Sequence, residues 1–176
     1  MVSNGQPATE GGAVIYVGTT VSSNPGLQQH IWWHAHLDTM LGHIGDALDA
    51  QAQSLGMSHN YWIYRHNAQR NTSALVEAAV RAWITSIQRG EAMRTADLNR
   101  WLARYALIKQ RANGKKASIY LRYETMTTLD ELCALLEHQP VEIPHLRVRY
   151  SVNRRMLVTL AIIRADAMLR RHKVLV

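Results

Sequence analysis

The side chains in this sequence best suited to bind a charged ligand are basic, and they gather after residue 94. We expect a helix from residue 95 to about residue 112. On it Arg100, Arg104 and Arg111 stand at positions i, i+4 and i+11, within one angular sector. Lys115 and Lys116 extend that charge past the helix end. Arginine outnumbers lysine by sixteen to four, and planar guanidinium groups favour paired hydrogen bonds to phosphate or carboxylate.

Two segments in which apolar and polar residues alternate, 117–125 and 145–151, are strand-like. If the two strands are neighbours, Tyr120 shares one face with several arginines, which suits phosphate binding combined with stacking of an unpaired base. The predicted nucleic-acid-binding residues are Arg100, Arg104, Arg111, Lys115, Lys116, Tyr120, Arg122, Arg147, Arg149, Arg154 and Arg155. No zinc-finger, RNP-type, KH or basic-zipper motif is present, so the pattern favours single strands without separating RNA from DNA.

Six histidines fall between residues 30 and 66, together with Asp38, Asp46 and Asp49. His36 and His43 are two helical turns apart and can share a face. His30, His34, His36 and Asp38 could form the divalent-metal set of a hydrolase, which is our least favoured alternative. A zincin would need a Glu between its two histidines, whereas Ile31, Trp32 and Trp33 separate His30 from His34. We therefore expect structural or interface histidines and no metal site.

The familiar sequence signatures of enzymes are missing. Gly11 and Gly12 precede an expected strand instead of following one, so neither a Walker nor a Rossmann loop is predicted. The nucleophile elbow of α/β-hydrolases is also absent. Cys133 lies in an apolar run and is expected to be a buried, inert thiol. The sequence predicts no catalytic residue and no cofactor.

The charge is unevenly distributed along the chain. Residues 1–64 contain four acids and no Lys or Arg, residues 65–116 carry a net charge of +8 and residues 117–176 a net charge of +3. This asymmetry suggests subunits that meet acidic face to basic face. Two adjacent tryptophans point about 100° apart on a helix, so one of them is an interface candidate. The predicted interface residues are Trp32, Trp33, Asp38, Asp46 and Asp49.

Helical spacing of apolar residues predicts a helical block across residues 27–112. The helices expected in it cover residues 27–55, 59–69, 72–89 and 95–112. Gly42 and Gly45 weaken the first of them and permit a break. Thr72 or Ser73 and then Thr95 are the expected caps, and Asn113-Gly114 ends the block.

The rest of the chain is expected to be a β-α-β-α part over about residues 117–172. Its helices run from a capping box at Thr128 to about residue 138, and from Asn153 to about residue 172. The strands near residues 117–125 and 145–151 permit a parallel pairing, which a strand near residues 13–20 could join. Residues 1–12 read as a flexible arm and residues 13–176 as one domain. The fold class is α+β and mainly helical, with three or four helices beside a small β layer.

These features predict a non-enzymatic nucleic-acid-binding subunit of a larger assembly. A nucleoprotein or capsid-like coat and a small subunit of a ribonucleoprotein complex both fit, as homo-oligomers or with other subunits. The alternative is a protein–protein adaptor in a secretion or virion machine. One cysteine, no signal-peptide pattern and no apolar run near 20 residues favour a cytoplasmic or particle-bound protein without a membrane contact.

Overall fold

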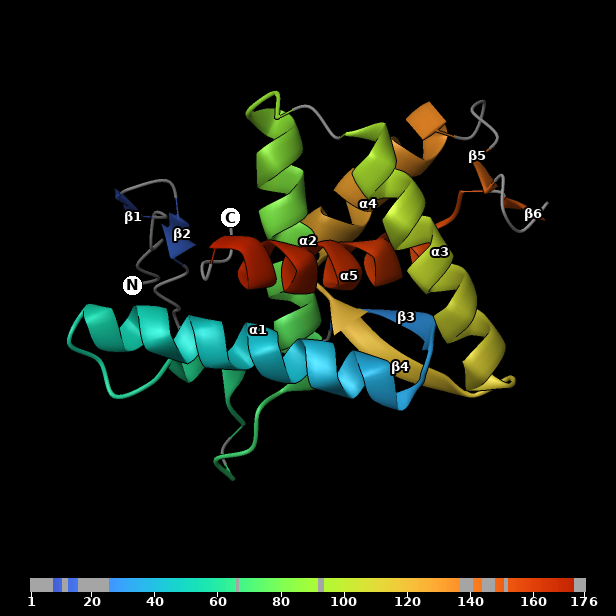
Figure 1. The fold of residues 1–176 in the computed structure, drawn as a ribbon. Helices are drawn as coiled ribbons and strands as arrows, with labels where there is room; N and C mark the ends of the chain where they lie inside the picture. The colour runs from blue at the N-terminus through green and yellow to red at the C-terminus, as the bar shows by residue number, and fades with distance from the viewer. Residues whose placement is uncertain are drawn as a thin grey trace.

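The computed structural model describes residues 8–10, 13–15, 26–65, 67–91, 94–136, 141–143, 148–150 and 152–172. It is mostly helical with short antiparallel strands, which confirms the predicted fold class (Figure 1). In chain order, the elements are β1 (Ala8–Glu10), β2 (Ala13–Ile15), β3 (Leu27–Trp32), α1 (Ala35–Ser54), the 3₁₀ helix η1 (Tyr61–Ile63), α2 (Thr72–Gln88), α3 (Thr95–Ala112), β4 (Lys116–Leu121), α4 (Tyr123–Leu136), β5 (Val141–Ile143), β6 (Val148–Tyr150) and α5 (Arg154–His172).

Helix α5 is the centre of the structure. It contacts α1, α2, α3, α4 and β3, and every residue from 156 to 166 is buried. Figure 1 shows α5 in red across the middle, with α1 along one side. A helix covered on all sides is expected to be apolar all round, and within Met156–Ile163 only Thr159 is polar, with its hydroxyl donating to the Arg155 carbonyl. The predicted cap is confirmed, because Asn153 Oδ1 accepts a hydrogen bond from the Met156 amide at 3.0 Å.

Strands β3 and β4 pair antiparallel, from Leu27 opposite Leu121 to Trp32 opposite Lys116. The prediction of a helix beginning at residue 27 is therefore wrong for its first turns. The apolar repeat that begins at Leu37 is helical, but α1 starts only at Ala35, where His34 Nδ1 accepts a hydrogen bond from the His36 amide. In the preceding strand β3, side chains alternate between the two faces, so Ile31 is buried while Gln28 and His30 are exposed. This strand forms by pairing with β4.

The chain turns from β4 into α4 earlier than the sequence predicts. The strand expected over residues 117–125 ends at Leu121, and the helix expected from Thr128 begins at Tyr123. Glu77 of α2 explains this, because its carboxylate accepts hydrogen bonds from the Arg122 amide (3.0 Å) and from the Thr125 hydroxyl. The Arg122 amide thus bonds to the side chain of Glu77 in α2 instead of continuing the backbone hydrogen bonds between β3 and β4.

The predicted parallel pairing is also wrong for the described strands. Strand β4 pairs with β3, β5 pairs with β6, and β2 pairs with β1, each antiparallel. The short connections of β1 to β2 and of β5 to β6 favour hairpins, whereas β3 and β4 pair across the long segment that holds α1, α2 and α3. Residues 16–20, 145–147 and 151 of the predicted strands lie outside the described residues, as does most of the predicted arm, although Ala8–Glu10 forms β1.

The helices α2 and α3 lie where the spacing predicts, with small changes at their ends. Asn71 caps α2 in place of Thr72 or Ser73, and Arg94 occupies the cap position of α3 without a side-chain hydrogen bond. Asn113 (φ 46°) ends α3 in the left-handed conformation, as predicted. The helix expected over residues 59–69 is wrong: a single 3₁₀ turn is followed by a bridge between Tyr64 and Arg70.

Candidate polyanion-binding surface

Basic side chains converge where the end of β3 and the start of α1 meet the end of α3 and the start of β4. The turn between α3 and β4 brings positions 111–116 beside Trp32 and Trp33, and the Trp33 amide donates to the Lys115 carbonyl at 3.0 Å. We call this set the basic corner; it consists of Trp32, His36, Arg111, Lys115, Lys116 and Arg155. Three of its cations come from one short segment, and Arg155 comes from the first turn of α5.

Trp32 holds two of these cations. The Lys116 Nζ lies 4.9 Å from the centre of a Trp32 ring, and the central carbon of the Arg155 guanidinium lies 4.8 Å from it. The Arg155 Nε also donates to the His30 carbonyl at 3.0 Å, which fixes its approach. Attraction between each cation and the electron-rich ring offsets part of the repulsion between two positive charges held on one side chain.

The basic corner contains no carboxylate to neutralise it. Residues 109–122 include five bases and no acid. Within the part of the chain that the structure describes, no ion pair joins Arg111, Lys115, Lys116 or Arg155 to a carboxylate. An uncompensated group of this kind attracts anions.

His36 lies against the guanidinium of Arg111, and nearby positive charge contributes to the shift of its pKa. Its Nε2 lies 3.3 Å from Arg111 Nη1. Desolvation first, and then the charges of His34, Arg111 and Arg104, lower the pKa of His36 below its ordinary value. The imidazole is therefore biased towards its neutral form, in which Nε2 can accept from the guanidinium.

A second basic group lies farther along α1 and α3. Asp166 of α5 is fully buried, and its Oδ1 is 2.7 Å from His43 Nδ1. Its Oδ2 is 3.0 Å from Arg170 Nε and 3.6 Å from Arg104 Nη1. We call these four residues the Asp166 cluster. His43 and Arg104 each lie seven residues, or about 10 Å along a helix, from His36 and Arg111 of the basic corner.

The remaining predicted phosphate-binding residues do not join one patch. Arg100 pairs with Asp97 at 3.8 Å, and Arg154 pairs with Asp130. Arg122 lies at the far end of β4 from Lys116, with its guanidinium carbon 5.6 Å from a Trp62 ring. Tyr120 is 49% exposed on the outer face of β4. Arg147 lies outside the described residues, and only the backbone of Arg149 is described, in β6, which does not pair with β4.

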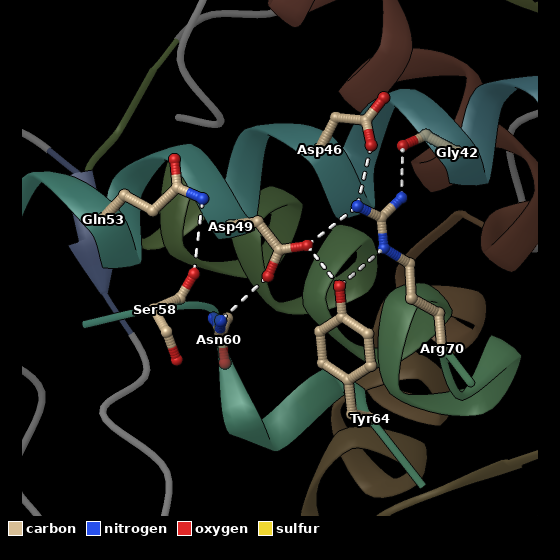
Figure 2. A network of polar contacts seen from close by, with 8 residues as sticks. All are labelled: Gly42, Asp46, Asp49, Gln53, Ser58, Asn60, Tyr64 and Arg70. Atoms are coloured by element: carbon tan, nitrogen blue, oxygen red, sulfur yellow. Dashed lines mark hydrogen bonds and ion pairs between the residues drawn. The ribbon is translucent and has the colours of Figure 1, made fainter. Parts of the chain in front are cut away.

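Two of the three acids predicted to form an interface, Asp46 and Asp49, pair with Arg70 of the same chain. Figure 2 shows Arg70 beside α1, with its guanidinium directed at Asp46, Asp49 and the Gly42 carbonyl. Asp49 is buried and accepts from the Asn60 amide, from the Tyr64 hydroxyl and from Arg70 Nη2, at 2.8, 2.6 and 2.8 Å. Its carboxylate is therefore not available to a neighbouring subunit.

The other predicted interface residues differ in exposure. Asp46 is 71% exposed although it pairs with Arg70, and Asp38 is exposed in the first turn of α1. Trp32 and Trp33 are both half-buried, and they lie at the end of β3 instead of on a helix. The prediction that they point about 100° apart, which assumed a helix, therefore does not hold. Both tryptophans pack against the core.

Sequence reasoning missed Arg70 and Asp166. Nothing in the local pattern of residues 65–71 marks Arg70 as the partner of α1. Asp166 does carry a signal, since it is the first acid in the mostly apolar helix that begins at Arg154. A charge in that setting is almost never buried without partners. The sequence does predict that His36 and His43 share a helical face, and on α1 they belong to the basic corner and to the Asp166 cluster, respectively.

The histidines do not assemble a metal site in the described part of the chain, where no group of three His, Cys, Asp or Glu side chains is close enough to hold an ion. His34 Nδ1 caps α1, and His30 Nδ1 lies 3.1 Å from the Ser118 hydroxyl. Cys133, expected to be buried, is half-buried and lines a groove of about 560 Å³ together with Gln29 and Arg155. None of the described helices is long and apolar enough to span a bilayer.

Comparison of the chain with protein-family models, with curated proteins and with solved structures finds no match, so the geometry above is the basis for its function.

Proposed function

We propose that this chain is a non-enzymatic nucleic-acid-binding subunit of a larger assembly and that the basic corner binds phosphates of a single strand. The observation that carries the proposal is a group of cations without carboxylate partners among the described residues: Lys116 and Arg155 lie over Trp32, Arg111 lies beside His36, and Lys115 adjoins Trp33 through its carbonyl. Neutralising several phosphates with such cations releases counterions and makes binding strong at low salt.

Two features favour a nucleic acid over an acidic protein as the ligand: positive charge extends over two neighbouring groups of residues, and an aromatic ring, that of Tyr120, is exposed. The Asp166 cluster extends the positive surface along α1 and α3, so an extended polyanion can contact both groups. Tyr120 lies on the same outer face of the β3–β4 sheet as Lys116, four residues along β4, and half of its surface is exposed. An exposed ring of this kind suits stacking of an unpaired base.

The proposal also includes contacts between neighbouring copies of the chain and the compartment in which they assemble. The acidic residues that stay exposed, Asp38 and Asp46, are on α1, whereas Lys115 and Lys116 are at the turn into β4. Contacts between these surfaces in neighbouring copies would assemble the subunits along the polymer. The cytoplasm or a nucleoprotein particle is the setting that this role requires.

The test is fluorescence anisotropy with labelled 20-nucleotide single-stranded RNA, single-stranded DNA and duplex DNA across a salt series. Wild-type protein is expected to bind the single strands, with affinity falling steeply as salt rises. Lys116→Ala and Arg155→Ala should each weaken binding and reduce the slope of log K against log salt by about 0.7, the value for one lost single-strand phosphate contact.

Arg65→Ala is the matched control, because it removes one exposed positive charge from a segment outside the basic corner. It should leave both affinity and slope near those of wild type. Equal losses in all three variants would mean that only net charge matters. No salt-dependent binding at low ionic strength would reject the proposal, and co-purification of one stoichiometric protein partner would favour the adaptor alternative.

A further inference from the structure

The Asp166 cluster is built differently from the ion pairs that hold surface elements together. Its carboxylate is completely buried, yet the three side chains around it reach solvent: the exposed fractions are 45% for His43, 37% for Arg104 and 57% for Arg170. They come from α1, α3 and α5. The buried acid thus anchors three exposed groups that all carry, or can carry, positive charge.

The charges in this cluster do not balance. One carboxylate faces two guanidinium groups and one imidazole, so the cluster has a net charge of +1 with neutral His43 and +2 with protonated His43. Asp166 Oδ2 has no well-aligned hydrogen bond among the described residues, although both guanidinium groups are near it. Each guanidinium has five N–H donors and uses only part of them here.

His43 is oriented for a ligand on its outer side. The short contact with Asp166 fixes the ring and assigns the proton to Nδ1, which leaves Nε2 as the outer nitrogen. Nε2 has no hydrogen-bond partner in the described part of the chain. When protonated, it adds a third charge-assisted donor to those of Arg104 and Arg170, and phosphate oxygens accept such hydrogen bonds strongly.

We propose that His43, Arg104 and Arg170, arranged by the buried Asp166, bind a phosphate monoester dianion, which in this protein is the terminal phosphate of a nucleic-acid strand. The charge of +2 on the protonated cluster matches a monoester dianion, whereas a phosphate within the strand carries a single charge. The terminal position rests on the proposed function, because a strand held at the basic corner about 10 Å away would place its end here.

The first experiment compares strand ends. The anisotropy assay uses the same labelled 12-nucleotide strand with a 5′-phosphate, a 3′-phosphate or hydroxyls at both ends, at pH 6.5. One phosphorylated strand is expected to bind about tenfold more tightly than the hydroxyl strand, the gain expected from charge-assisted hydrogen bonds. Equal affinities for all three strands would overturn the assignment of the ligand to a strand terminus and leave the proposed function standing.

The second experiment detects the site without a strand. Inorganic phosphate alone is titrated into the protein while the Hε1 resonance of His43 is followed by NMR. A saturable shift that Arg170→Ala abolishes supports the site even if no oligonucleotide binds, in which case the proposed function fails by itself. A His43 resonance that does not respond to phosphate, together with no preference among strand ends, rejects the site.

Variants separate binding from folding. His43→Gln and Arg170→Ala should lose the tenfold preference, and circular dichroism at the assay temperature should show both variants folded, because two partners of Asp166 remain in each. Arg171→Ala is the control, since its guanidinium is committed to Asp97 at 2.8 Å; it should keep the preference. Loss of the preference in Arg171→Ala as well would overturn the assignment to these residues.

Discussion

At the scale of single residues, Asp49 is buried and nevertheless keeps its negative charge. Burial raises the pKa of a carboxyl group, but hydrogen bonds from Tyr64, from the Asn60 amide and from Arg70 outweigh that effect, so the pKa of Asp49 lies below its ordinary value. Gly45 makes the approach of Arg70 possible, because a Cβ there would lie 2.8 Å from Arg70 Nη1.

Asp49→Asn tests this network. The amide keeps the shape but leaves Arg70 without its buried charge partner, and we expect a loss of about 3 kcal/mol in the free energy of unfolding at pH 7. Urea denaturation followed by circular dichroism measures it. Asp46→Asn, at a side chain that is 71% exposed, is the control, with an expected loss below about 1 kcal/mol. Similar losses in both variants would contradict the network.

The same variant predicts a pH dependence. Because the folded pKa of Asp49 is depressed, its charge stabilises the fold fully above the ordinary aspartate pKa, and the stabilisation is lost as the pH falls through the folded value. The difference in unfolding free energy between wild type and Asp49→Asn should be constant from pH 7 to 5 and shrink below about pH 4. A difference that grows on acidification would show that the folded pKa is raised instead.

At the scale of elements, Glu77 decides where a strand becomes a helix. It is 2% exposed in the middle of α2, and besides the Arg122 amide and the Thr125 hydroxyl it accepts from Arg81 Nε at 2.6 Å. One buried carboxylate thus joins α2 to the junction of β4 and α4. Its partners are 45 and 48 residues away in the sequence, so no local pattern reveals them.

Glu77→Ala is expected to loosen that junction more than the rest of the fold. The Arg122 amide and the Thr125 hydroxyl lose their acceptor in a buried place, at a cost of about 1–3 kcal/mol each. Hydrogen exchange read by mass spectrometry should therefore speed up in peptides covering residues 120–127. Glu124→Ala, an exposed acid in the first turn of α4, is the control. Uniform acceleration across all helices would mean global destabilisation instead.

The sequence predicted elements well where their signal was local and poorly where it was not. The apolar spacing of Leu98, Leu102 and Tyr105 and the left-handed end at Asn113 depend on near neighbours, and α3 was placed to within a residue. Residues 27–32 were misassigned because their strand exists only through pairing with β4. At the candidate site, Arg111, Lys115 and Lys116 are adjacent in the chain and could be predicted together. Their proximity to Arg155 comes from packing of α5 against β3.

At the scale of the whole molecule, α5 connects the other helices, and we expect them to unfold together with it. Each of the other four α-helices contacts it, and its buried stretch includes Ile162 and Ile163, both fully buried. Loss of packing at that position is felt by all of its neighbours at once, because the interior is close-packed.

Ile162→Ala should therefore lower the stability of the entire fold by about 2–5 kcal/mol. Tryptophan fluorescence, which reports on Trp83 and Trp101 of other helices, and circular dichroism should give the same midpoint. Leu107→Ala, at a side chain that is 38% exposed on α3, should cost less than about 1 kcal/mol. Two separated transitions in Ile162→Ala would contradict a single cooperative unit.

The position of α5 in the chain also sets the order of events during synthesis. A ribosome releases α1, α2 and α3 first, with the apolar faces that later enclose α5 still open to water. The contact between Arg155 and the His30 carbonyl joins groups 125 positions apart, and closing so long a loop slows folding. The nascent chain thus has no complete interior until its last described helix emerges, and until then those exposed apolar faces are prone to aggregation.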